Sequence, residues 1–91
     1  MDARAHVLVS GLVQGIGFRK WTRWLAGKLS VTGWVRNTDD KVEILVEGPD
    51  SVIEDFIKRL WRGPIGSRVE TVDVKKENYK GEFSIFEIKY E

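Results

Sequence analysis

The spacing of hydrophobic residues changes several times along the chain, and each change predicts a new element. Residues 5–10 alternate, with Ala5, Val7 and Val9 on one side, and this predicts a β-strand. From residue 18 the period lengthens to three and four residues, which predicts an amphipathic helix. The positions of its inner stripe are Phe18, Trp21, Thr22, Leu25, Ala26 and Leu29. A glycine-rich segment, residues 11–17, separates the strand from the helix.

The second part of the chain repeats this change of period. Residues 31–37 and 42–47 alternate on either side of a polar turn, which predicts a β-hairpin. Ser51 and Glu54 have the spacing of a capping box, so we expect a second helix to begin there, and Gly63-Pro64 to end it. Residues 69–74 and 83–90 predict two further strands. Their alternation slips once in each, near Val72 and at Ile85-Phe86, and predicts a bulge in both.

The predicted order is therefore β-α-β-β-α-β with an additional strand at the end. Two amphipathic helices can both bury their apolar stripes if they lie on one face of an antiparallel sheet. We expect a ferredoxin-like α/β sandwich (class α+β), and a length of 91 residues predicts a single domain over 1–91. This fold supports many functions, so it does not identify one.

Composition excludes several classes of protein. With 42% hydrophobic and 32% charged residues, the chain has the composition of a folded globular domain rather than a disordered one. It contains no cysteine, which favours a reducing, cytoplasmic location over a disulfide-stabilised secreted one. No apolar run reaches the ~18 residues of a membrane span, and the start lacks a signal-peptide pattern. We expect no association with membranes.

Charge is distributed unevenly, although the formal net charge is only +1. Residues 11–37 hold five Lys or Arg and no acid, whereas residues 38–57 hold seven acids and one Lys. A basic field around the glycine-rich segment would attract anions. Two oppositely charged, solvated faces would give the same pattern.

A glycine-rich turn between a strand and a helix has the chemistry of an anion site. Glycine allows a positive φ, so that successive N–H groups can point to one centre, and the helix N-terminus adds partial positive charge. Arg19, in the first helical turn, can contact two phosphate oxygens at once. The patterns of nucleotide-binding P-loops and dinucleotide folds are absent. A tight turn beside a surface arginine remains an alternative.

Asn37 is the second candidate. It follows a predicted strand in phase with Val35, and thus leaves the sheet on the helix side, toward the glycine-rich segment. Its amide could hold a water molecule but not deprotonate it; an Asx turn is the alternative. One histidine, His6, no cysteine and scattered acids predict no metal site. We expect His6 and Trp34 to be packing or solvated residues.

Two motifs carry a family resemblance. The segment Gly11-Leu-Val-Gln-Gly-Ile-Gly-Phe-Arg19 resembles the acylphosphatase signature G-x-V-Q-G-V-x-F-R, and Gly33-Trp-Val-Arg-Asn37 resembles the second signature, which ends on Asn. The similarity covers essentially the whole chain, and its tail is similar to that of archaeal members, which together with few Gln and Asn suits a thermophilic source. One departure is Lys41, where the family pattern has a glycine, in a turn that is one residue short.

The resemblance implies a stand-alone enzyme that hydrolyses acyl phosphates to a carboxylate and inorganic phosphate, without metal or cofactor. Arg19 and Asn37 would be its catalytic residues, one clamping the phosphoryl group and the other orienting the attacking water. Main-chain amides would bind the phosphate along Val13, Gln14, Gly15, Ile16, Gly17 and Phe18. Inorganic phosphate would compete with substrate. The physiological acyl phosphate is not specified by the sequence.

Two other functions remain open at this stage. Related domains occur within larger carbamoyl-transfer proteins, so a non-catalytic anion-binding or regulatory domain is one alternative. A single-stranded nucleic-acid binder is the other, because RNA-recognition motifs share the βαββαβ order. The chain lacks their aromatic RNP motif, so we expect no nucleic-acid partner. We expect a monomer; an exposed edge strand or Trp34 offers a route to a dimer.

Overall fold

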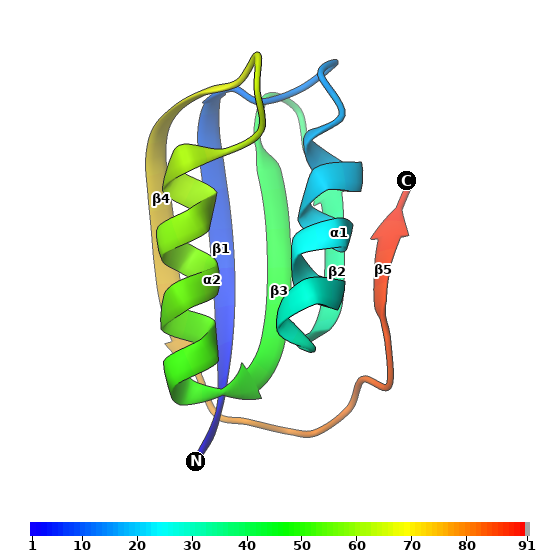
Figure 1. Ribbon diagram of the computed structural model, residues 1–91, viewed down its shortest axis with the longest axis vertical. Coiled ribbons are helices and arrows are strands. Elements are labelled where there is room, and N and C mark those ends of the chain that lie inside the picture. The colour runs from blue at the N-terminus through cyan, green and yellow to red at the C-terminus, as the bar shows by residue number, and fades with distance from the viewer. Residues whose placement is uncertain (91) are drawn as a thin grey trace.

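Seven elements follow one another in the computed structural model, which describes residues 1–90. They are β1 (Asp2–Leu12), α1 (Phe18–Leu29), β2 (Thr32–Asn37), β3 (Val42–Pro49), α2 (Asp50–Arg62), β4 (Arg68–Glu77) and β5 (Phe86–Lys89). The two helices lie side by side on one face of a five-stranded sheet (Figure 1). The expected ferredoxin-like sandwich is therefore confirmed.

The core fills the space between the helices and the sheet. The inner face of α1 buries Phe18, Thr22, Leu25 and Ala26, as its period predicts, and α2 buries Ile53, Phe56 and Leu60. Alternate residues of β1 and β3 meet them from the sheet: Ala5, Val7, Val9, Val42, Ile44 and Val46 are fully buried. Because the glycine-rich segment joins β1 to α1, this packing fixes both of its ends.

The sheet is mixed rather than wholly antiparallel as expected. Its order is β4-β1-β3-β2-β5, and β5 pairs with β2 in parallel, with Gly33 opposite Phe86 and Arg36 opposite Lys89. The reason is the route of the chain: β4 lies at one edge, and the following segment crosses the foot of the sheet to the opposite edge (Figure 1). From there β5 runs in the direction of β2. Consequently the C-terminal ends of β2 and β5 lie at the same end of the sheet as the glycine-rich segment.

One predicted bulge is present, and the other is absent. The register of β1 against β4 shifts between Ser10 and Gly11, which leaves Glu70 unpaired. Gly11 has φ 123°, and a β-carbon there would lie 2.1 Å from the Arg68 carbonyl oxygen, so the close approach requires glycine. The slip at Ile85-Phe86 is no bulge, because β5 begins only at Phe86.

The predicted capping box is wrong. The N-cap of α2 is Pro49, without a side-chain cap, and the helix already begins at Asp50. The N–H of Asp50 instead donates to the main-chain oxygen of Met1, at 2.8 Å. This contact gives the first N–H of α2 a partner outside the helix. Gly63, with φ 67°, ends the helix as predicted.

Candidate functional site

The glycine-rich segment is shaped by two left-handed residues. Gly15 has φ 76° and Gly17, the N-cap of α1, has φ 81°. A β-carbon at either position would meet nothing within 4 Å, so the need for glycine comes from the backbone angle rather than from crowding. An L-residue in this conformation costs roughly 1–2 kcal/mol. The two glycines thus let the chain reverse between β1 and α1 in a tight curve.

Main-chain donors of this segment are free. Within residues 1–90, no N–H from Gly15 to Lys20 donates a hydrogen bond to another protein group; the first bond of the helix runs from Trp21 N–H to Gly17 oxygen, at 3.0 Å. The first N–H groups of a helix have no partner within the helix and carry partial positive charge. The segment and the start of α1 together offer a run of unpaired donors.

A cavity of about 290 Å³ lies beside these donors. Its lining brings together six of the predicted site residues: Val13, Gly15, Gly17, Phe18, Arg19 and Asn37. Two predicted residues lie outside it, since Gln14 turns toward the β2–β3 hairpin and Ile16 packs against the core. Two further residues, Lys20 and Tyr90, line the cavity without having been predicted.

Asn37 lines this cavity and carries a buried oxygen without a partner. Its Oδ1 is fully buried and makes no hydrogen bond, and it is the one such side-chain atom found within residues 1–90. An Asx turn would have used this oxygen, so that alternative is excluded. A buried polar atom without a partner costs about 1–3 kcal/mol, so it is normally retained for a water or a ligand. This unpartnered acceptor therefore belongs to a residue of the cavity wall.

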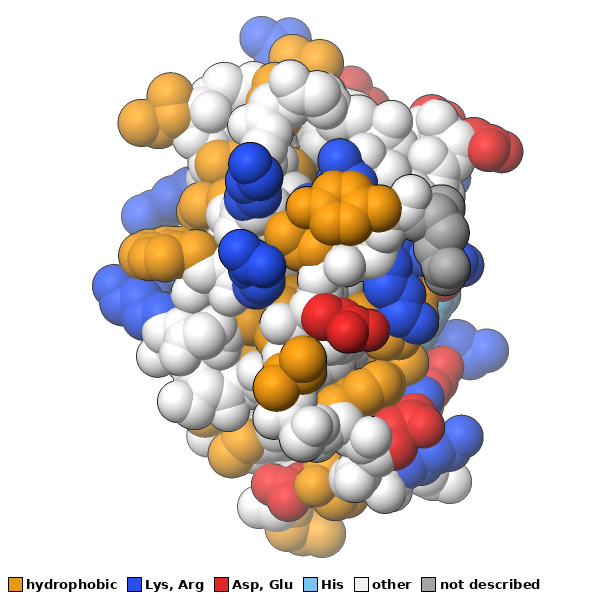
Figure 2. Space-filling view, turned by 90° about the vertical axis from the view of Figure 1, so that its right-hand side faces the viewer, with side chains coloured by type: hydrophobic (Ala, Val, Ile, Leu, Met, Phe, Trp, Pro, Cys, Tyr) orange, Lys and Arg blue, Asp and Glu red, His pale blue; other side chains and the backbone are white. Residues whose placement is uncertain are grey.

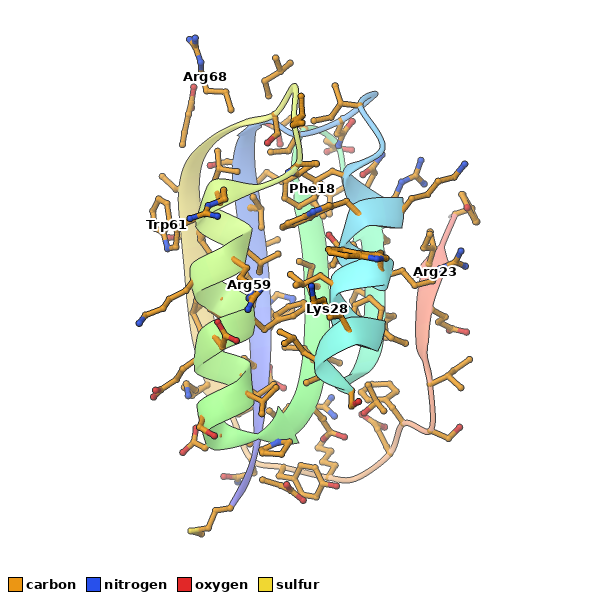
Figure 3. All side chains as sticks on the ribbon, viewed as in Figure 1. Phe18, Arg23, Lys28, Arg59, Trp61 and Arg68 are labelled. Atoms are coloured by element: carbon orange, nitrogen blue, oxygen red, sulfur yellow. The ribbon has the colours of Figure 1, made fainter. Side chains whose placement is uncertain are left out.

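Arg19 contributes the positive charge. No carboxylate of residues 1–90 lies within ion-pair distance of its guanidinium. The guanidinium makes a cation–π contact with the ring of Tyr90, whose centroid lies 4.9 Å from Cζ. The helix itself reinforces the charge, because α1 carries four bases and no acid. Figure 2 shows basic side chains on the side of the molecule turned to the viewer, with acidic ones among and below them. Figure 3 shows Arg23 and Lys28 on the outer side of that helix, and Phe18 pointing inward.

Gln14 holds the hairpin turn against the glycine-rich segment. Its Nε2 donates to the main-chain oxygens of Thr38 and Lys41, at 3.0 and 2.9 Å. The turn itself is closed by a bond from Thr38 N–H to Lys41 oxygen. No residue of this turn has a positive φ, so Lys41 is accommodated where the family pattern has glycine. The shortened turn therefore remains attached to the site.

A second, larger groove of about 610 Å³ lies on the open face of the sheet and also touches Asn37. Three of its side chains interact with one another, because Glu43 contacts His6 Nε2 and Arg36 Nε, each at 2.6 Å. Burial alone would raise the pKa of Glu43, but these two donors hold it below its ordinary value. His6, expected to be a packing or solvated residue, is thus the partner of a carboxylate. Trp34 contacts the cations of Arg36 and Lys89, which lie 5.3 and 4.7 Å from its ring centroid.

Residues 1–90 offer neither a metal-binding cluster nor a membrane-spanning helix. No group of three or more His, Cys, Asp or Glu residues is placed to hold a metal ion there. None of the helices in that range is both long enough and apolar enough to cross a membrane. The cavity beside Arg19 and Asn37 is therefore the site whose chemistry calls for explanation.

Comparison with known proteins gives a consistent result. The acylphosphatase family model matches residues 5–88. An acylphosphatase of Pelotomaculum thermopropionicum is 48% identical over 89 residues, covering 97% of both chains. The crystal structure of acylphosphatase from Bacillus subtilis superposes with a TM-score of 0.93 at 34% identity, covering 99% of this chain and 100% of the other. Full-length HypF, in a phosphate- and nucleotide-bound form, matches with a TM-score of 0.90 at 29% identity, over 98% of this chain but 12% of its own length.

These similarities extend over nearly the whole chain and over nearly the whole length of the acylphosphatases. Thermophilic hosts occur among the relatives, as the composition suggested. Both helices and the two signature segments lie within the matched region, which omits, of the strands, only the first residues of β1 and the last residue of β5. The chain belongs to the acylphosphatase family.

Proposed function

We propose that this enzyme hydrolyses the carboxyl-phosphate bond of acyl phosphates in the cavity beside Arg19, by attack of a water molecule held by Asn37. The observation that carries the proposal is that Asn37, whose buried Oδ1 has no partner, lines the same cavity as Arg19. A cation and an acceptor side by side suit a dianion and a water molecule. The free N–H groups of the adjoining segment add donors for the same anion.

The phosphoryl group is bound by main-chain and side-chain donors. The amides along Val13–Phe18 surround its oxygens, as the family resemblance implies, and Arg19 contacts two of them at once. The phosphoryl-transfer transition state is loose and keeps its charge on these oxygens, so fixed donors and precise placement supply most of the catalysis. Neither a metal ion nor a cofactor is required in this scheme.

The attacking water is oriented by Asn37. Its Oδ1 accepts one O–H of the water, which turns a lone pair of the water oxygen toward phosphorus. The new P–O bond forms as the bond between phosphorus and the carboxyl oxygen breaks, and the electron pair leaves with the carboxylate. An oxygen of the substrate phosphate takes the proton of the water. The leaving carboxylate is stable as an anion and needs no general acid.

The direct test is an assay with benzoyl phosphate in the presence of EDTA. We expect hydrolysis, with inorganic phosphate as a competitive inhibitor, because the product binds where the phosphoryl group bound. Loss of activity in EDTA that returns with a divalent cation would contradict the metal-independent mechanism. A pH–rate profile governed by an enzyme group with a pKa near 6–7 would contradict proton transfer to the substrate.

A second function has one observation in its favour. The chain matches 12% of the length of HypF, so the same fold also serves as one part of a larger protein. A non-catalytic anion-binding domain would bind inorganic phosphate but leave benzoyl phosphate intact.

The proposed setting of the enzyme is a monomer in the cytoplasm, consistent with the absence of cysteine.

A further inference from the structure

The crossing segment, residues 78–85 between β4 and β5, is fixed by one buried carboxylate at the end of the sheet opposite the cavity. Glu47, which is 2% exposed, accepts hydrogen bonds from the N–H groups of Lys80, Gly81 and Glu82, at 2.8, 3.2 and 3.2 Å. Arg4 donates to the same carboxylate at 3.2 Å. Three successive amides bound by one side chain determine the path of the crossing segment at this point.

Arg4 strengthens this attachment from the other side. Besides Glu47 it pairs with Glu77, at the end of β4, and with Glu82, in the crossing segment. Its guanidinium also lies 5.6 Å from the ring centroid of Phe83. Burial alone would raise the pKa of Glu47, but the donors of the segment and Arg4 lower it, so the carboxylate is charged. Arg4 and Glu47 together therefore hold the chain from Glu77 to Phe83.

The position of β5 follows from this anchor. After the crossing segment, Gly33 N–H donates to Ile85 oxygen at 3.0 Å, and the parallel register then runs from Phe86 to Lys89. Lys89 is opposite Arg36, so Tyr90 comes level with Asn37 at the end of β2. Parallel neighbours end at the same edge of a sheet. This is how the last described residue reaches a cavity formed by residues 13–20.

At that edge the Tyr90 ring meets the guanidinium of Arg19, with 4.9 Å between its centroid and Cζ. The face of an aromatic ring attracts a cation without using its N–H donors. A carboxylate partner would consume those donors and repel an anion. The ring thus restricts Arg19 while leaving its fork available for phosphate oxygens.

We propose that Tyr90 is a positioning residue for Arg19, and that Glu47, at the opposite end of the sheet, determines where Tyr90 lies through the segment that it anchors. The proposal rests on the proposed function only in taking the ligand of Arg19 to be a phosphate. It assigns a role in the site to the C-terminal strand, whose sequence lies outside both signature motifs. Tyr90 acts on the ligand through Arg19.

The test uses Tyr90→Ala and Tyr90→Phe, with Tyr79→Ala as a matched control in the crossing segment. Inorganic phosphate is titrated into each protein, and the Nε–Hε resonance of Arg19 is followed by NMR. We expect Tyr90→Ala to weaken phosphate binding about threefold to fivefold, which is the size of an exposed cation–π contact. The Nε–Hε chemical shift of Arg19 should move to the averaged value of a freely moving side chain. Tyr90→Phe and Tyr79→Ala should both stay within twofold of the unaltered protein. An unchanged affinity in Tyr90→Ala, or an equal loss in Tyr90→Phe, overturns the role of the ring.

Glu47→Gln tests the second claim, that Glu47 determines where Tyr90 lies. It should reproduce the loss of phosphate affinity, and the double variant with Tyr90→Ala should lose no more than Tyr90→Ala alone, because both act through one contact. Losses that multiply would show that Glu47 acts by another route. If Glu47→Gln does not fold, Lys80→Pro removes one of the three anchoring N–H groups and must show the same non-additivity. The Arg19 resonance is also recorded before phosphate is added, so a protein that fails to hydrolyse benzoyl phosphate still tests this inference.

Discussion

The side chain of Gln14, in the first signature segment, donates to the main-chain oxygen of Thr38, at 3.0 Å, directly after the second signature segment. A second donation to Lys41 oxygen, at 2.9 Å, completes the contact. Asn37 immediately precedes the turn that is held in this way. Gln14 is thus a support for the placement of Asn37, in addition to any contribution of its own amide.

Removing this support should loosen the site more than the fold. We expect Gln14→Ala to lower kcat on benzoyl phosphate about tenfold, because Asn37 loses its fixed position, and to destabilise the protein by about 1–2 kcal/mol for two lost hydrogen bonds. Steady-state kinetics and urea unfolding measure the two effects. Full activity in a destabilised Gln14→Ala protein would show that the turn holds Asn37 without Gln14.

The need for a left-handed residue at Gly17 can be tested by comparing substitutions there with a substitution at a helical glycine. Gly17→Ala should destabilise the protein by about 1–2 kcal/mol, since φ 81° is unfavourable for an L-residue, and Gly17→Asn should cost less. Gly27, exposed in the middle of α1 with open space around it, is the control. Gly27→Ala should stabilise the protein by about 0.5–1 kcal/mol. Equal effects at both positions in urea unfolding would mean that the left-handed turn is not retained in solution.

Arg19 should be intolerant of a conservative change. In Arg19→Lys a single ammonium replaces a planar fork, so we expect both phosphate affinity and kcat to fall, and kcat/KM to drop roughly tenfold to a hundredfold. Arg23→Lys, on the exposed side of the same helix, is the matched control and should be nearly neutral. An Arg19→Lys enzyme with undiminished kcat/KM would refute the bidentate contact.

Stability should fall in acid because two glutamates have lowered pKa values in the folded state. The pKa of Glu47 and that of Glu43 both lie below the ordinary value of 4.5. Each carboxylate therefore contributes stability that is complete above about pH 4.5 and is lost as the pH falls through its folded-state pKa. Unfolding free energies measured between pH 7 and pH 3 should decline, and Glu47→Gln should flatten that decline. Glu87→Gln, at an exposed strand position, should leave the slope unchanged.

Much of the fold could be predicted because the informative signals are local. The buried stripe of α1 and the hairpin of β2 and β3 follow from period alone, and the glycine at 17 from the angle that the turn requires. Other features depend on contacts between distant segments. The true start of α2 depends on the Met1 carbonyl, and no periodicity indicates such a partner.

The site shows the same division. Arg19 and Asn37 were predicted from motifs, and the structure places both in one cavity. Tyr90 was missed because alternation marks a strand without indicating which edge it joins, and only the parallel register brings this residue to the cavity. The anchoring role of Glu47 was equally hidden, since a glutamate within an alternating strand is usually solvated.

The central claim is that Asn37 orients water and does not bind the phosphoryl group. The most direct measurement compares kcat on benzoyl phosphate with the inhibition constant of inorganic phosphate in Asn37→Ala, using Asn78→Ala as the control at the other asparagine of the chain. The account predicts that kcat falls about a hundredfold to a thousandfold while the inhibition constant changes less than threefold. Equal losses in both quantities would contradict it, because Asn37 would then be a phosphate ligand.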